Sequence, residues 1–227
     1  MNKNDEIITK DEVVLTPEHN AQLDILRSDI TRYIGGKRYS HTLAVERECA
    51  SLAAQFGLCE DEAYRLRISA LLHDITKEKK LDGQLELCRA LGIDYTQNDV
   101  SSPKVFHSKT AAALISRDFP ELATDDVCNN IKYHTVGRED MTISEKLLYL
   151  ADYIEETRDF DDCKKLRRYF YSQKNRAGKT ISRHLDETLV ISFDMTLRIL
   201  IDEGQCIAAE TVASRNFLIR SLTDETK

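Results

Sequence analysis

A histidine and an aspartate, His73-Asp74, close an apolar stretch that starts at Ala70 and offer two metal-binding groups side by side. Burying such titratable groups among apolar side chains is costly unless they are paired, hydrogen-bonded or bound to a metal ion. Neighbouring residues on a helix point about 100° apart, so these side chains can reach one ion only where the helix ends and the backbone turns. The pair therefore indicates a metal site at a helix end, although the bare dipeptide is common.

Four more polar residues stand in surroundings that predict core-facing or helix-end positions: His41, His107, His134 and Asp152. Asp152 interrupts the apolar run 147–154, where a carboxylate is hard to explain without a cation. Any one of these histidines alone is more often a structural residue than a ligand, and Asp152 alone could be buried against an arginine. The specific signal is the ordered set of one histidine, the His-Asp pair, two further histidines and an aspartate, spread over successive helical segments.

Imidazole and carboxylate together suit iron, manganese, zinc, cobalt or nickel better than magnesium or calcium. Four histidines and two aspartates are more ligands than one ion usually needs. A shared carboxylate, Asp74, could bridge two ions about 3.5–4 Å apart, as two-metal phosphoryl-transfer sites require. A hydroxide bridging the ions would then be the nucleophile near neutral pH.

The segments that must position these residues all have helical character. The chain has only 3 Pro and 8 Gly, and its apolar residues recur at helical spacing. The two remaining histidines, His19 and His184, fit exposed helix faces. We expect an all-α fold, a compact single-domain helical bundle. Helices are predicted over about 17–33, 37–56, 61–74, 82–91, 105–118, 125–135, 143–157, 162–172, 181–201 and 209–222, with loops at about 93–104 and 173–180.

The 227 residues suit one large domain, and the 41% hydrophobic content suits a folded core. We predict a flexible leader over 1–16 and one domain over 17–224, with the metal ligands between about 37 and 160 and a C-terminal helical part over about 161–222. A net charge of −7 disfavours broad nucleic-acid binding. Six dispersed cysteines, the lack of a signal-like start and the lack of a membrane-length apolar run predict a cytoplasmic protein with reduced thiols.

At these residues the sequence resembles the HD-domain superfamily of metal-dependent phosphohydrolases. It is most similar to the YqeK family of bacterial HD proteins, which hydrolyse diadenosine tetraphosphate symmetrically to two ADP. The resemblance extends over about residues 21–222. It is carried by residues 38–42, 71–77, 106–108, 131–138 and 145–155, and further along by 158–160 and 211–216.

The resemblance implies a di-iron centre and a purine nucleotide polyphosphate as substrate. By analogy, one ion is held by His41, His73, Asp74 and Asp152, and the other by Asp74, His107 and His134. Ligand type alone does not fix the metal, because manganese and cobalt can occupy such a site. A homodimer is compatible with the sequence.

Several residues near these ligands are suited to phosphate. Asp74 and Lys77 are the predicted catalytic residues, and Lys77, one turn after His73-Asp74, could reach a phosphate as a point charge. Arg138 and Arg158 are fork-shaped donors that fit phosphate oxygens. The predicted substrate-binding residues are Lys77, Thr135, Arg138, Arg158 and Asn216, and candidates for contacting the base are Tyr149, Phe160 and Asn216.

Several alternatives remain open at this point. Arg138 and Arg158 could instead form surface ion pairs with neighbours such as Glu139 and Asp159. The same scaffold could serve a phosphatase for a deoxynucleotide, an alarmone or a cyclic nucleotide. It could also serve a di-iron oxygenase or a nucleotide-binding regulatory module. The presence of all six metal-ligand positions counts against a degenerate, non-catalytic site.

Overall fold

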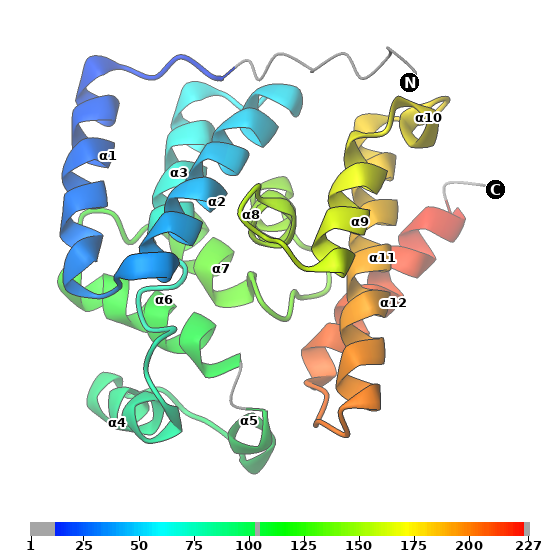
Figure 1. Cartoon of the computed structure of the whole chain (residues 1–227). Helices are drawn as coiled ribbons and strands as arrows, with labels where there is room; N and C mark the ends of the chain where they lie inside the picture. The colour runs from blue at the N-terminus through cyan, green and yellow to red at the C-terminus, as the bar shows by residue number, and fades with distance from the viewer. Residues whose placement is uncertain (1–11, 103–104, 225–227) are drawn as a thin grey trace.

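The computed structural model describes residues 12–102 and 105–224, and in these ranges the chain forms helices and no strand. The all-α prediction is thereby confirmed. Figure 1 shows the helices packed around a central α8. They are α1 (Pro17–Asp29), η1 (Ile30–Arg32), α2 (Gly36–Gln55), α3 (Glu60–Leu72), α4 (Leu81–Leu91), α5 (Gln97–Ser101), α6 (Phe106–Asp118), α7 (Asp125–Tyr133), α8 (Ile143–Ile154), α9 (Asp161–Tyr171), α10 (Gln173–Arg176), α11 (Ile181–Asp202) and α12 (Ala209–Asp224).

The helix starts follow from local capping chemistry. Thr16 accepts a hydrogen bond from the amide of His19, and Pro17 occupies the first turn of α1. α8 begins with a capping box in which Thr142 and Glu145 each bind the other's backbone amide. The helix predicted over 17–33 is in fact α1 followed by the short 3₁₀ turn η1. Both predicted loops also contain a short helix, α5 and α10, which lack the length that reveals helical periodicity.

Among the helices that end earlier than predicted, α3 and α7 have ends that bear on the site. α3 ends at Leu72 and α7 ends at Tyr133, so His73 and His134 occupy the position directly after the last helical residue. The last carbonyls of a helix have no intrahelical donor. A histidine placed directly after such an end can donate to one of them.

The core lies where α2, α3, α7 and α8 pack on one another; α9 and α11 cover the other side of α8, and α12 packs on α11. Leu52, Leu66, Ile131 and Leu148 are fully buried there. Burial of each such side chain contributes about 1.5–3 kcal/mol. This packing sets the positions of the helix ends that carry the predicted ligands.

The prediction that His184 is an exposed helix residue is wrong. His184 is buried, its Nε2 lies 2.9 Å from the carbonyl oxygen of Phe170, and its ring stacks on those of Tyr169 and Phe170. The contact joins α9 to α11. The pattern along α11 alone could not reveal which neighbouring helix would cover this residue.

Only part of the predicted leader lies within the described residues. Residues 1–11 of the predicted leader 1–16 lie outside the described residues, whereas Leu15 packs into the core and the amide of Thr16 donates to Glu60.

Across 12–102 and 105–224, none of the helices combines the length and apolar character needed to cross a membrane. All six cysteines are free.

Candidate metal centre

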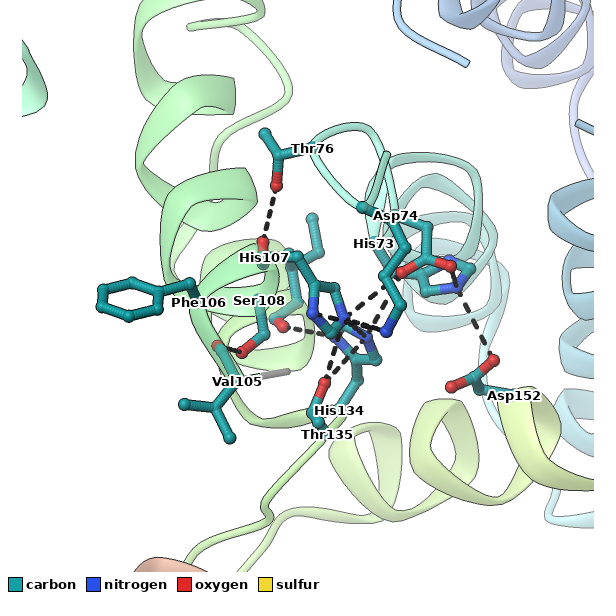
Figure 2. A network of polar contacts seen from close by, with 12 residues as sticks. His73, Asp74, Thr76, Val105, Phe106, His107, Ser108, His134, Thr135 and Asp152 are labelled. Carbon is teal, nitrogen blue, oxygen red and sulfur yellow. Dashed lines mark hydrogen bonds and ion pairs between the residues drawn. The ribbon is translucent and has the colours of Figure 1, made fainter. Parts of the chain in front are cut away.

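Six imidazole and carboxylate side chains from distant parts of the chain meet beside α8. Figure 2 shows five of them, with Asp74 between the imidazoles and Asp152 approaching from α8. Five segments supply the six residues: α2 supplies His41, the turn after α3 supplies His73 and Asp74, α6 supplies His107, the turn after α7 supplies His134, and α8 supplies Asp152.

Asp74 lies at the centre of the cluster and is 2% exposed. Its Oδ1 lies 3.3 Å from Nε2 of His107 and 3.8 Å from Nε2 of His134. Its Oδ2 lies 3.4 Å from Nε2 of His73 and 3.8 Å from Nε2 of His41. Each carboxylate oxygen thus faces two imidazoles, which is the arrangement that a carboxylate shared between two ions needs.

Asp152 closes the other side of the cluster. Its Oδ1 lies 3.0 Å from Nε2 of His41 and 3.8 Å from Nε2 of His73. Two groups of potential ligand atoms result, and within each group the atoms lie within 4.8 Å of one another. One group is His41, His73 and Asp152, and the other is His73, Asp74 and His134.

The helix ends orient two of the imidazoles. Nδ1 of His73 donates to the carbonyl oxygen of Ala70 at 2.6 Å, and Nδ1 of His134 donates to that of Ile131 at 2.7 Å. Both acceptors are last-turn carbonyls left without an intrahelical donor. A hydrogen bond at one ring nitrogen selects the tautomer whose other nitrogen carries the lone pair, so both Nε2 atoms face the cluster as ligands.

A buried hydrogen-bond network joins the turn after α3 to α6. Oγ1 of Thr76 donates to the carbonyl oxygen of His107 at 2.9 Å, as Figure 2 shows, and Nε2 of Gln84 donates to the carbonyl oxygen of Thr76 at 2.7 Å. Oγ1 of Thr110 donates to Oε1 of Gln84 at 2.6 Å. The network holds His107 opposite Asp74 without using either side chain.

The polar atoms left without partners indicate that a cation fits this cluster. Nε2 of His41, Nε2 of His73 and Oδ1 of Asp74 are fully buried and have no partner in hydrogen-bond geometry, although Nε2 of His41 lies 3.0 Å from Oδ1 of Asp152. Leaving one such atom unsatisfied costs about 1–3 kcal/mol, so three in one place require an explanation. Imidazole nitrogens and carboxylate oxygens around a common centre are the ligand set of a divalent transition metal.

The protonation states of three ligands also suit metal binding, whereas the pKa of His41 is raised to about 9, because the lowering effect of its burial is outweighed by hydrogen bonds to Asp152 and Glu155. Burial and the neighbouring His73 lower the pKa of His134 to about 4, and burial and Lys77 hold the pKa of His107 well below its usual value. Burial by itself raises the pKa of Asp74, but His73, His107 and Lys77 outweigh it and hold that pKa well below the usual range. At neutral pH, His107 and His134 are neutral and Asp74 is ionised, which are the forms that bind metals.

Three of the residues predicted to bind substrate lie at the cluster. Nζ of Lys77 lies 3.1 Å from Nε2 of His107, and Oγ1 of Thr135 lies 3.2 Å from the same atom. Arg158 donates to Oδ1 of Asp152 at 2.7 Å. All three therefore lie beside the imidazole and carboxylate groups of the cluster.

Two of the residues predicted to bind substrate are not at the cluster. Arg138 donates to the buried carboxylate of Glu145 through Nε and Nη2, and its guanidinium lies 5.1 Å from the ring centre of Tyr133. The ion-pair alternative therefore describes Arg138 in this structure, with Glu145 as the partner. Asn216 is exposed and accepts a hydrogen bond from Arg215 at 3.4 Å.

Two residues at the cluster had no role in the prediction. Nη1 of Arg38 donates to Oδ2 of Asp74 at 2.7 Å. Glu155 is completely buried, and its Oε1 lies 3.0 Å from Nδ1 of His41. Both residues lie inside the segments that resemble the HD family, but only tertiary packing shows which atoms they meet.

A cavity of about 790 Å³ opens beside the cluster, between α8, α9 and α11. The residues that line it include Lys77, His134, Thr135, Asp152 and Arg158. The base candidates Tyr149 and Phe160 also line this cavity, and Asn216 does not. The cavity gives a ligand access to Lys77, Arg158 and two of the six clustered residues.

Gly137 holds the turn that carries His134 and Thr135 close to α11 and α12, so its replacement by alanine is expected to destabilise the protein. Its φ is +69°, and an added Cβ would lie 2.8 Å from Oγ of Ser214 and 2.9 Å from Cζ of Phe193. We expect Gly137→Ala to lower the free energy of unfolding by about 2–4 kcal/mol, from backbone strain and overpacking together. Denaturant unfolding measures the loss.

The matched control is Gly178→Ala. Gly178 has a similar φ of +74° and no atom within 4 Å of an added Cβ. This control variant therefore reports the backbone strain alone, about 1–2 kcal/mol. Equal losses in the two variants would show that the close approach at Gly137 contributes nothing.

Comparison with known proteins gives one family match and several relatives. A model of the HD domain family matches residues 38–157. A Bacillus subtilis (strain 168) protein named symmetrical bis(5'-nucleosyl)-tetraphosphatase is 28% identical over 182 residues, covering 80% of this chain and 89% of that protein. A Halalkalibacterium halodurans protein of the same name is 27% identical over 199 residues, covering 87% of this chain and 95% of that protein.

A solved structure supports the fold. It is the crystal structure of a predicted HD superfamily hydrolase involved in NAD metabolism from Clostridium acetobutylicum. The two chains superpose with a TM-score of 0.74 and share 29% sequence identity, over 87% of this chain and 97% of that chain.

Proposed function

The chain belongs to the HD domain family, and on this premise we propose that it is a metal-dependent phosphohydrolase that cleaves diadenosine tetraphosphate and related dinucleoside tetraphosphates symmetrically. Diadenosine tetraphosphate would give two ADP. The observation that carries the proposal is the buried cluster of four histidines and two aspartates around unpartnered ligand atoms. The names of the relatives support the choice of substrate.

In this proposal the six residues would hold two metal ions. His41, His73, Asp74 and Asp152 would hold one ion, and Asp74, His107 and His134 the other. Iron is the proposed metal, with manganese and cobalt as alternatives. Bound metal ions supply a nucleophile from water near neutral pH and offset the charge of the attacked phosphate.

Cationic side chains of the protein would offset the negative charge of the substrate's phosphates. Lys77 presents an ammonium group next to His107, and burial lowers its pKa despite the opposing effect of Asp74 and Asp152. Nζ of Lys77 is thus suited to donate a hydrogen bond, or its proton, to the oxygen of the leaving nucleoside diphosphate. Arg158 pairs with Asp152 and lines the cavity, where its guanidinium is suited to bind a phosphate.

Product identification tests the proposal. Protein purified without oxygen is analysed for bound metals and then incubated with diadenosine tetraphosphate. ADP as the sole nucleotide product supports the proposal, and AMP with ATP would contradict symmetrical cleavage. A panel of a deoxynucleoside triphosphate, an alarmone and a cyclic nucleotide tests the alternative substrates, and faster turnover of any of these would replace the proposed one.

Metal binding is also expected to stabilise the fold. Metal-free protein contains at least three buried unsatisfied ligand atoms, which a cation would satisfy. Addition of Mn²⁺ at about 100 times its dissociation constant should stabilise the folded state by about 2.7 kcal/mol, or raise the unfolding midpoint by about 5–10 °C. Differential scanning calorimetry measures the shift. An unchanged midpoint would contradict metal binding at this cluster.

A cytoplasmic location and a homodimeric state stay predictions from the sequence. The domain boundaries at 17 and 224 are likewise proposed. Fractionation of the producing cells and light scattering of the purified protein test the first two.

A further inference from the structure

Two chemically different groups of residues line the cavity beside the metal cluster. Lys77 and Arg158, which lie at the cluster, are cationic. Tyr153, Phe160 and Ile199 line the same cavity with aromatic and apolar side chains. Phe160 is 68% exposed and Ile199 is 38% exposed, so two large apolar side chains face solvent in a cavity that leads to a polar cluster. Such an arrangement is typical of a binding site for a ligand that has one anionic part and one flat apolar part.

Phe160 conflicts with its local structure in a way that indicates a function. It is the N-cap residue of α9 and makes no side-chain capping hydrogen bond. Serine, threonine, aspartate and asparagine are preferred at this position, and a residue without a capping side chain costs about 1 kcal/mol. A large exposed aromatic ring at a cap position therefore lowers the stability of α9 without burying the ring. Residues that break a local rule in this way tend to mark functional sites.

Connectivity limits the distance between Phe160 and the phosphate-binding Arg158. Phe160 follows Arg158 by two residues, and two residues of extended chain span at most about 7 Å. Arg158 is anchored to Asp152 through both its Nε and its Nη2. The segment can therefore contact a phosphate and a group one sugar away from that phosphate at the same time.

The charges of the lining residues differ between the surroundings of Phe160 and the metal cluster. Asp161 and Asp162 directly follow Phe160 in the chain and line the cavity with it, as do Glu203 and Lys165. Carboxylates beside Phe160 disfavour phosphate there by like-charge repulsion, whereas Lys77 and Arg158 attract it at the cluster. An uncharged aromatic base has no such conflict with the carboxylates.

We propose that Phe160, Tyr153 and Ile199 form a nucleobase subsite in which the purine of one nucleoside diphosphate half stacks on the Phe160 ring. The proposal rests on the proposed function, and it adds the recognition of the base to that of the phosphates. Stacking tolerates any base, because every base has an aromatic face. The subsite therefore serves to hold one half of the substrate while the anhydride bond lies at the metal cluster.

Binding of two product-like probes tests the subsite. Isothermal titration calorimetry gives the dissociation constants of ADP and of inorganic pyrophosphate for the wild-type protein and for Phe160→Ala. Loss of one stacked base should weaken ADP binding by about 5- to 100-fold. Pyrophosphate lacks the base, so its affinity should change by less than about two-fold. Phe160→Trp should retain the affinity for ADP.

The matched control is Ile201→Ala. The side chain of Ile201, on α11, is apolar and 64% exposed like that of Phe160, but it does not line the cavity. This control variant should bind ADP as the wild type does. Equal weakening of ADP and pyrophosphate in Phe160→Ala, an unchanged affinity for ADP, or no ADP binding by the wild type would overturn the subsite. Failure of the proposed function has a different signature, because diadenosine tetraphosphate would then stay intact while ADP binding still depended on Phe160.

Discussion

The variant Asp74→Asn is expected to lose hydrolysis of diadenosine tetraphosphate by about 10³-fold or more, together with its affinity for metal. Both oxygens of Asp74 face two imidazoles each, so one substitution removes a charged ligand from both proposed ion sites. An amide of the same shape offers a neutral oxygen and an NH₂ group that repels cations. Removing a single preorganised charge contact to the reacting group already costs about 10²–10³-fold.

Metal content and steady-state kinetics measure the effect of Asp74→Asn. The matched control is Asp61→Asn, because Asp61 is an exposed aspartate on α3, the helix that leads to Asp74. The stabilisation by Mn²⁺ should also disappear in Asp74→Asn and persist in Asp61→Asn. An Asp74→Asn protein that keeps both its metal and its turnover would remove the basis of the two-ion proposal.

The sequence predicted which residues would lie in the cluster better than how they would be held there. Polar residues in apolar runs are expensive, so the pattern alone marked His41, His134 and Asp152 as needing partners. The prediction placed His134 at the end of a helix that runs to about residue 135, whereas α7 ends at Tyr133 and His134 follows it directly. This position determines how the imidazole is oriented, because the end of the helix offers the carbonyl oxygen of Ile131 as a hydrogen-bond acceptor for Nδ1 of His134.

Partners that come from other helices could not be predicted. A helical pattern reports that a side chain is buried, but it does not report what covers it. His184 was predicted on an exposed face and instead links α11 to Phe170 of α9. Arg138 was assigned to phosphate by its position after His134, and it is occupied by the buried carboxylate of Glu145. In each case the decisive contact lies on an element whose packing the local pattern does not specify.

Glu155 illustrates the same limit and leads to the second large expected effect. Glu155 follows the last residue of α8, where the chain leaves the helix, and Arg167 donates to the carbonyl oxygens of Ile154 and Glu155. The hydroxyl of Thr157 donates to Oε1 of Glu155 at 2.8 Å. The carboxylate is thereby fixed opposite Nδ1 of His41 at 3.0 Å. A carboxylate in this position orients the imidazole and raises its basicity toward a metal at Nε2.

The variant Glu155→Gln is therefore expected to weaken metal affinity by about 10- to 100-fold. Glutamine keeps the shape and one acceptor oxygen but loses the charge, so the fold should be retained while His41 becomes a poorer ligand. Glu155 does not line the cavity and contacts the cluster through His41, so it acts as a positioning residue. The kcat measured at saturating metal should consequently return toward the wild-type value.

The neighbouring Glu156 provides a matched control for Glu155. Its exposed side chain pairs with Arg47 on the surface at 2.7 Å, so Glu156→Gln should leave metal affinity unchanged. Titration of metal-free protein with Mn²⁺, followed by activity measurements along the same titration, separates affinity from turnover. If kcat of Glu155→Gln stayed low at saturating metal, Glu155 would have to act on the reaction itself. If Glu156→Gln weakened metal binding as strongly, the effect would reflect the overall charge of the turn, because the hydrogen bond to His41 is intact in that variant.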